Sequence, residues 1–173
     1  MKKQTIFFLI LLVISISLIA NLMQMERYSY SSQDQLTAQN AKAIVISCMD
    51  FRLIDDAVHY LNSQGYNNNY DNFILAGASL GYNQTTYSAW AEILNKHIEL
   101  AEQLHDIKEV IVIDHMGCGA YKLFYNKNAF SENEEIALHK ENFDKFRQTI
   151  TRKYPQLSVK TLLMKLTGEI VNL

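Results

Sequence analysis

The feature that most constrains the fold is a run of four consecutive apolar residues, VIVI, inside a predicted strand over residues 109–114. A strand with apolar side chains on both sides needs cover on both faces of its sheet, and this is typical of parallel sheets. A similar run, AIVIS, occupies residues 43–47, and a further strand is predicted over 72–76. The chain is therefore expected to form a buried, mostly parallel sheet.

The segments between these strands have apolar residues at helical spacing and predict helices over 53–64, 85–104, 117–125 and 132–154. A last strand over 159–166 and a hairpin partner over 169–173 are joined by Thr167 and Gly168. The alternation predicts an α/β fold with about four parallel strands, a C-terminal antiparallel hairpin strand, and helices on both faces. The segment 77–81 (GASLG) has no lysine, which favours a tight strand-to-helix turn over a phosphate-binding loop.

The first 25 residues have a different character from the rest of the chain. A positive start, MKKQ, precedes an apolar run over residues 6–20, which is typical of a signal peptide or a short membrane anchor. We expect export to the periplasm, either as a soluble protein after cleavage or anchored to the inner membrane, and the choice stays open. A polar arm over 26–42 and an α/β domain over 43–173 are predicted to follow.

Charge and cysteine content narrow the function classes. A formal net charge of −2 and 20% charged residues give no basic surface for nucleic acid. The chain has two cysteines, Cys48 and Cys118, and an exported protein can join such a pair in a disulfide. That pairing is one of two readings of these residues.

The other reading is a metal site at the ends of two strands. Cys48 directly follows the strand 43–47, and His115 and Cys118 follow the strand 109–114, so neighbouring strands would bring the three side chains together. Thiolate and imidazole are zinc ligands, and three protein ligands leave a fourth position open, as in catalytic zinc sites. A disulfide would leave His115, Asp50 and Arg52 without a role, so the metal reading is favoured.

The two motifs, Cys-x-Asp-x-Arg at 48–52 and His-x-x-Cys-Gly at 115–119, resemble those of the β-class carbonic anhydrases. The similarity extends from about residue 43 to the C-terminus. The resemblance implies that Cys48, His115 and Cys118 bind one zinc ion per chain and that Asp50 and Arg52 form a catalytic dyad. It also implies a dimer or higher oligomer, often with the pocket at the subunit interface.

The implied reaction is the reversible hydration of carbon dioxide to bicarbonate and a proton. Zinc makes hydroxide available at neutral pH, and Asp50 can accept a hydrogen bond from that hydroxide and orient it. Arg52 can hold Asp50 as a two-pronged partner. In part of the family the aspartate is itself the fourth zinc ligand, so Asp50 can also close the site, and activity is expected to depend on pH.

Three departures from the family's usual pattern concern the pocket and the N-terminus. Phe51 replaces a small residue, and Ile74 and Leu75 replace a charged residue and an amide after the second strand. The N-terminal helices of longer members are absent or reduced to residues 21–42. Apolar Phe51, Ile74 and Leu75 would suit a related zinc hydrolase of carbonyl sulfide or carbon disulfide. A non-catalytic zinc or thiol protein is the alternative from another class.

The remaining histidines and the aromatic residues have structural interpretations. The histidines on predicted helices are interpreted as solvated side chains rather than proton shuttles, and they are His59, His97, His105 and His139. Six aromatic residues are expected to pack in the core or at a dimer interface, and they are Tyr66, Tyr70, Tyr82, Tyr87, Trp90 and Tyr121.

Overall fold

The computed structural model describes residues 12–13, 15–17 and 39–173, which fall in two compact units, 1–38 and 39–173. In the first unit, residues 12–13 and 15–17 are helical. The rest of the predicted signal or anchor segment, 1–25, and residues 26–38 of the predicted arm lie outside the described residues. Across the part of the chain that is described, no helix has the length and apolar character needed to cross a membrane.

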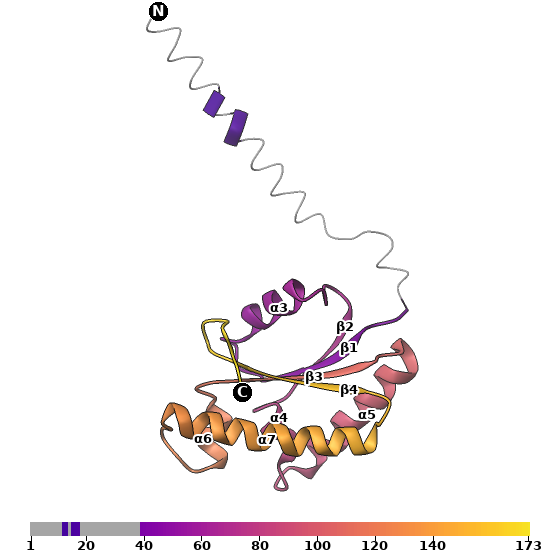
Figure 1. Cartoon of the computed structure of the whole chain (residues 1–173), viewed down its shortest axis with the longest axis vertical. Coiled ribbons are helices and arrows are strands. Elements are labelled where there is room, and N and C mark those ends of the chain that lie inside the picture. The colour runs from indigo at the N-terminus through magenta and orange to yellow at the C-terminus, as the bar shows by residue number, and fades with distance from the viewer. Residues whose placement is uncertain (1–11, 14, 18–38) are drawn as a thin grey trace, which may run out of the picture. The chain divides into compact units, whose positions relative to one another are not determined.

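The second unit is built on one five-stranded sheet with the strand order β2-β1-β3-β4-β5 (Figure 1). Strands β1 to β4 run parallel to their neighbours, and β5 pairs antiparallel with β4. This confirms the predicted sheet, including its hairpin partner. The strands are β1 (Ala43–Ser47), β2 (Tyr70–Ile74), β3 (Glu109–His115), β4 (Ser158–Met164) and β5 (Ile170–Val171).

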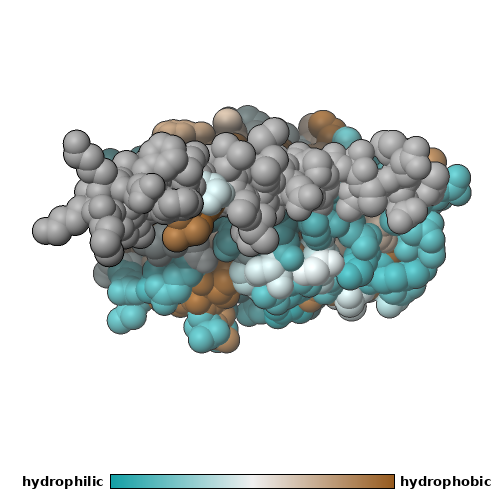
Figure 2. Space-filling model, turned by 90° about the horizontal axis from the view of Figure 1, so that it is seen from above, coloured by the Kyte–Doolittle hydropathy of each residue, from teal (hydrophilic) through white to brown (hydrophobic). Residues whose placement is uncertain are grey.

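Helices cover both faces of this sheet, as the unbroken apolar strands require. The helix α3 (Ile54–Ser63) lies on one face, where its Leu61 shares a core cluster with Val45 and Ile111. The helices α5 (Ser88–His105) and α7 (Glu132–Lys153) lie on the other face, where Ile44 and Val112 belong to a second cluster (Figure 1). Among the coloured atoms of Figure 2, most of the visible surface is hydrophilic, with smaller hydrophobic patches.

The structure differs from the prediction in the segment after the second strand. Strand β2 begins and ends two residues earlier than expected, because the chain turns after Leu75, where the Ala78 N–H donates to the Leu75 carbonyl. The predicted turn over 77–81 contains the start of a short helix, α4 (Ser79–Asn83). Gly81 is needed there, since a Cβ atom at this position would lie 2.3 Å from the Ala76 carbonyl oxygen.

The strand order places the ends of β1 and β3 side by side. Strand β1 pairs with β2 on one side and with β3 on the other, so the direction of strand progression reverses between β1 and β3. Ser47, the last residue of β1, is aligned with Ile113 of β3. In open α/β sheets, sites form outside the carboxyl ends of the strands at such a switch point.

Candidate metal centre

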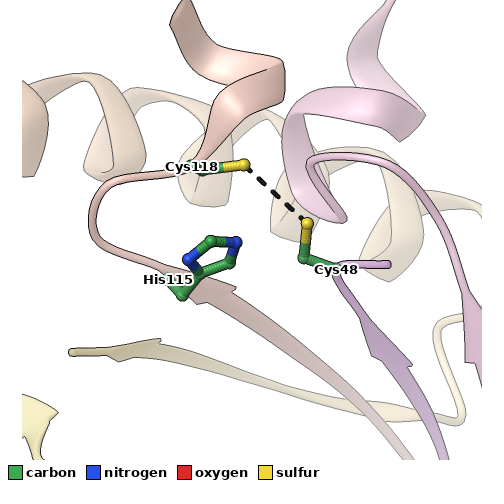
Figure 3. A group of neighbouring side chains, drawn as sticks. All are labelled: Cys48, His115 and Cys118. Atoms are coloured by element: carbon green, nitrogen blue, oxygen red, sulfur yellow. Dashed lines mark hydrogen bonds between the residues drawn. The ribbon is translucent and has the colours of Figure 1, made fainter. Parts of the chain in front are cut away.

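Three buried side chains converge at the carboxyl ends of β1 and β3. Cys48 follows β1, His115 ends β3, and Cys118 precedes α6 (Gly119–Phe124). Their ligand atoms all lie within 4.8 Å of one another, and the three side chains point toward a common centre (Figure 3). His115 is fully buried, and the two cysteines are at most 4% exposed. The sequence prediction that these residues come together is confirmed.

The two sulfur atoms are spaced as ligands of one ion. Cys48 Sγ and Cys118 Sγ are 3.8 Å apart, and both cysteines are free thiols in the structure. Two sulfurs bound to zinc at about 2.3 Å each, at a tetrahedral angle, would be about 3.8 Å apart, whereas a disulfide needs about 2.05 Å. The observed spacing therefore fits a shared metal ion without any rearrangement of the thiols.

The imidazole of His115 has one nitrogen engaged and one without a partner. Nδ1 lies 3.0 Å from the Met116 carbonyl oxygen and must donate to it, because a carbonyl can only accept. Nε2 is buried and has no hydrogen-bond partner among the residues that the structure describes. A buried polar atom without a partner is costly, so an unpaired imidazole nitrogen beside two thiols is a donor set that fits a zinc ion.

The electrostatics of the cluster favour one negative charge on the thiol pair. The hydrogen bond with Cys118 lowers the pKa of Cys48, against the effect of burial, and His115 and the Gly77 N–H at 3.4 Å lower it further. The bond to Cys48 and burial raise the pKa of Cys118. Burial lowers the pKa of His115, but the neighbouring Cys48 sulfur and its negative charge outweigh this and raise that pKa overall. A cation at the centre would favour both thiolates.

Asp50 and Arg52 lie next to this cluster as a two-pronged pair. Arg52 Nε donates to Asp50 Oδ1 at 2.9 Å, and Arg52 Nη2 donates to Oδ2 at 2.6 Å. The Arg52 backbone N–H also donates to Oδ1, at 3.1 Å. These bonds hold the pKa of Asp50 at about 2. Oδ2 is 3.7 Å from His115 Nε2, so the carboxylate faces the metal centre while Arg52 holds it.

The centre opens into a surface cavity of about 720 Å³ with largely apolar walls. Phe51 is 82% exposed and Leu123 is 74% exposed, and both line the cavity. Tyr87 stacks on Trp90 with ring centroids 4.6 Å apart on another part of the wall. Phe51 is thus a pocket residue, as predicted, and two of the six singled-out aromatics also line it.

Two predictions from the sequence are wrong. Ile74 and Leu75 do not line the cavity, because the chain turns immediately after β2 and buries Leu75 in the core beside Tyr82. His139 is not a solvated helix histidine but is fully buried. His59 and His97 are exposed, as that interpretation expects, whereas His105 is half-buried and hydrogen bonds Asp71 at 2.8 Å.

The structure also reveals a buried polar cluster that the sequence analysis did not single out. Asp114, one residue before His115, accepts hydrogen bonds from the Ser79 N–H at 2.9 Å and the Ser79 hydroxyl at 2.5 Å. The Tyr121 hydroxyl and His139 Nδ1 also donate to it, at 2.7 and 3.0 Å. Asp114 therefore ties α4, α6 and α7 to the strand that positions His115.

With this geometry established, comparisons with known proteins place the chain in a family. A family model described as "Putative carbonic anhydrase" matches residues 38–172. The chain belongs to this family. The segment that matches this carbonic anhydrase family includes the whole sheet and every residue of the metal centre.

The chain is also similar to individual proteins and in fold to a solved structure. An uncharacterized protein of Rickettsia conorii is 37% identical over 141 residues, which are 81% of this chain and 76% of that protein. An uncharacterized protein of Rickettsia bellii is 38% identical over 141 residues, covering 81% of this chain and 86% of that protein. The crystal structure of a β-carbonic anhydrase of Aspergillus fumigatus is similar in fold, with a TM-score of 0.51 and 15% identity over 96% of this chain and 90% of that one.

The resemblance to the β-class carbonic anhydrases and the predicted fold class are thus confirmed. The Cys48, His115 and Cys118 cluster could hold a metal ion. The identity of that ion and the roles of Asp50 and Arg52 stay predictions.

Proposed function

We propose that the protein catalyses the zinc-dependent reversible hydration of carbon dioxide to bicarbonate and a proton. The observation that supports this proposal best is a set of three buried metal-ligand atoms beside the Asp50 carboxylate, which Arg52 holds in place with hydrogen bonds. Membership of the carbonic anhydrase family supports the same reaction class. In this proposal Cys48, His115 and Cys118 hold one zinc ion per chain.

The bound ion would act as a Lewis acid that makes water nucleophilic near neutral pH. Asp50 would then orient the attacking water. Its Oδ1 already accepts two hydrogen bonds from Arg52, but Oδ2 accepts one and faces the centre, so Oδ2 has a lone pair left for the proton of the water. With its pKa near 2, Asp50 stays a hydrogen-bond acceptor throughout the range in which the water ionises. Asp50 is therefore an orienting group rather than the titrating one.

A second reaction has one observation in its favour. The cavity at the centre has mostly apolar walls, and Phe51 is its most exposed aromatic side chain. Carbonyl sulfide and carbon disulfide are more hydrophobic than carbon dioxide, so apolar walls favour their binding over that of carbon dioxide. Hydration of carbon dioxide at a much lower rate than hydrolysis of these substrates would favour this alternative.

We also propose that a second copy of the chain covers the mouth of the cavity. Phe51, Leu123 and Met49 are more than 60% exposed around it, and exposed apolar clusters of this kind mark protein interaction sites. A homodimer would bury these side chains and exclude bulk water from the centre. Tyr87 and Trp90, on the same wall, would be partly shielded by the partner.

The deciding experiment measures zinc and activity on the same samples of the full chain. One zinc per chain, with hydration of carbon dioxide in a stopped-flow assay, is expected for the wild type, and loss of both in Cys48→Ser and His115→Ala. His59→Ala, at an exposed histidine outside the cavity, is a matched control that should keep both. A metal-free protein with an oxidised Cys48–Cys118 pair would refute the proposal. Stoichiometric zinc without turnover of any of the three substrates would favour a non-catalytic zinc protein.

A further inference from the structure

A buried carboxylate lies against the metal-binding loop and is not explained by the residues discussed so far. Glu135 belongs to the first turn of α7, and it is 8% exposed. Its Oε1 accepts a hydrogen bond of 2.6 Å from the backbone N–H of Gly117, which lies between His115 and Cys118. Glutamate is rarely buried unless its carboxylate has hydrogen-bond partners, so this short bond indicates a specific role for Glu135 at the loop.

The bond from Gly117 leads directly to His115 through one peptide group. The N–H of Gly117 and the carbonyl of Met116 belong to the same planar unit. Its N–H side donates to Glu135, and its carbonyl oxygen accepts the bond of 3.0 Å from His115 Nδ1. The side chain of Glu135 and the ring of His115 are therefore connected through the two ends of a single amide.

His139 lies beside Glu135, and a backbone bond from Met116 fixes the start of the loop. His139, one helical turn later, has its Nε2 3.9 Å from Glu135 Oε1, and its Nδ1 donates to Asp114 at 3.0 Å. The backbone N–H of Met116 donates to the Met164 carbonyl at 2.9 Å. Helix α7 thus restrains the Met116–Gly117 peptide, and strand β4 restrains the preceding His115–Met116 peptide.

Gly117 itself needs this support. Its φ of +72° lies in the left-handed region, which glycine adopts without strain but also leaves readily. A loop with this flexible residue between two ligands gains an ordered geometry only from contacts outside it. Glu135 provides the contact to the Gly117 amide.

We propose that Glu135 is a positioning residue that orients His115 through the Met116–Gly117 peptide, an inference that rests on the proposed zinc site. Hydrogen bonding at the N–H end polarises the amide and makes its carbonyl a stronger acceptor for His115 Nδ1–H. This fixes the tautomer in which Nε2 is free and faces the thiols. Histidine ligands are commonly fixed by a carboxylate or carbonyl on their other nitrogen, and here a carbonyl that is itself held by a carboxylate does so.

The experiment compares three variants of the full chain with the wild type. Glu135→Met keeps the volume and helix propensity but has no strong acceptor, and Glu135→Gln keeps an oxygen that can accept from Gly117. Glu141→Ala, on the same helix but exposed and paired with Lys145, is the matched control. The readouts are hydrogen exchange of the Gly117 amide in metal-free protein, zinc affinity by competition with a chelator, and the absorption spectrum of cobalt-loaded protein.

For Glu135→Met we expect Gly117 exchange at least about tenfold faster, zinc affinity about 10- to 100-fold weaker, and a changed cobalt spectrum. Glu135→Gln and Glu141→Ala should stay within about threefold of the wild type in both measurements. Glu135→Met and Glu135→Gln could instead lower the unfolding temperature by the same amount and leave Gly117 exchange, zinc affinity and the cobalt spectrum unchanged. That result would mean that Glu135 has a merely structural role, and it would overturn the inference.

The outcomes for zinc and for the loop can be told apart. A wild type that binds no zinc, but whose Gly117 protection depends on Glu135, refutes the proposed function and supports the positioning of the loop. Normal zinc binding with a Gly117 amide that exchanges freely in the metal-free wild type overturns the positioning and leaves the proposed function intact. The second comparison needs only the wild type, so it decides the question even if Glu135→Met does not fold.

Discussion

Replacing Asp50 with asparagine tests the chemistry of the centre with the smallest change of shape. The carboxylate accepts three hydrogen bonds from Arg52, and its Oδ2 keeps a lone pair that faces the metal centre. Asparagine can satisfy the two donors on the Oδ1 side with its carbonyl oxygen. Its NH₂ group would then stand in the place of Oδ2, where it opposes Arg52 Nη2 and can donate but not accept.

The expected loss follows from the bond that disappears. A hydrogen bond to a charged group contributes about 1.5–3 kcal/mol, and each 1.36 kcal/mol of transition-state stabilisation changes the rate about tenfold. The kcat/KM for carbon dioxide should therefore fall about 10- to 200-fold in Asp50→Asn. Zinc content should stay at one per chain, because Asp50 is not among the three residues whose ligand atoms converge.

The measurement is stopped-flow hydration with a pH indicator, normalised to zinc in each sample. Asp55→Asn is a matched control, because Asp55 is an exposed acid in the first turn of α3 and does not line the cavity. It should keep the wild-type rate. A rate for Asp50→Asn within about threefold of the wild type, at full zinc content, would show that Asp50 does not orient the attacking water.

Three further predictions concern stability, pH and assembly. Gly81→Ala should lower the free energy of unfolding by about 1–3 kcal/mol, because the added Cβ would lie 2.3 Å from a carbonyl oxygen. Gly119→Ala, with open space around the added Cβ, is the control and should change the free energy of unfolding little. Equal urea midpoints for the two variants would contradict the prediction. The pKa of Asp50 is lowered from 3.8 to about 2 by Arg52, so this pair stabilises the fold fully above pH 3.8 and loses its effect as the pH falls through about 2. The stability difference between the wild type and Asp50→Asn should narrow between pH 5 and pH 2, by less than about 1 kcal/mol because Arg52 is half-exposed, and a constant difference would count against the pair. Leu123→Glu should convert the proposed dimer to monomer in sedimentation velocity, and an unchanged dimer would place the interface elsewhere.

The sheet and the metal cluster could be predicted because both depend on patterns that are local in the sequence. Unbroken apolar runs mark β1 and β3 as buried parallel strands, and parallel strands end at the same edge of a sheet. Cys48 and His115 then had to lie close together once these strands were neighbours. The one assumption that the sequence could not test was that pairing, which the register of Ser47 with Ile113 now gives directly.

The surroundings of the cluster could not be predicted, because they depend on how separate elements pack. Ile74 ends β2 and Leu75 follows it, and both were expected at the pocket, but the direction in which the chain turns away from the sheet decides which side chains line the cavity. That direction depends on the positive φ of Gly77 and Ala78, and no apolar pattern encodes it. Of residues 74–78, only Ala76, inside the turn, lines the cavity.

The buried polar residues of α7 did leave a signal in the sequence, and it identifies what an apolar pattern alone misses. Phe143, Phe146 and Ile150 mark the buried face of this helix, and stepping back by four residues along the same face gives His139 and then Glu135. A histidine and a glutamate on an apolar face must each find a partner, because an unpaired polar group is costly to bury. Their partners, Asp114 and Gly117, flank His115 in the sequence. The histidine and the glutamate on this apolar face are therefore side chains that contact the chain on either side of His115.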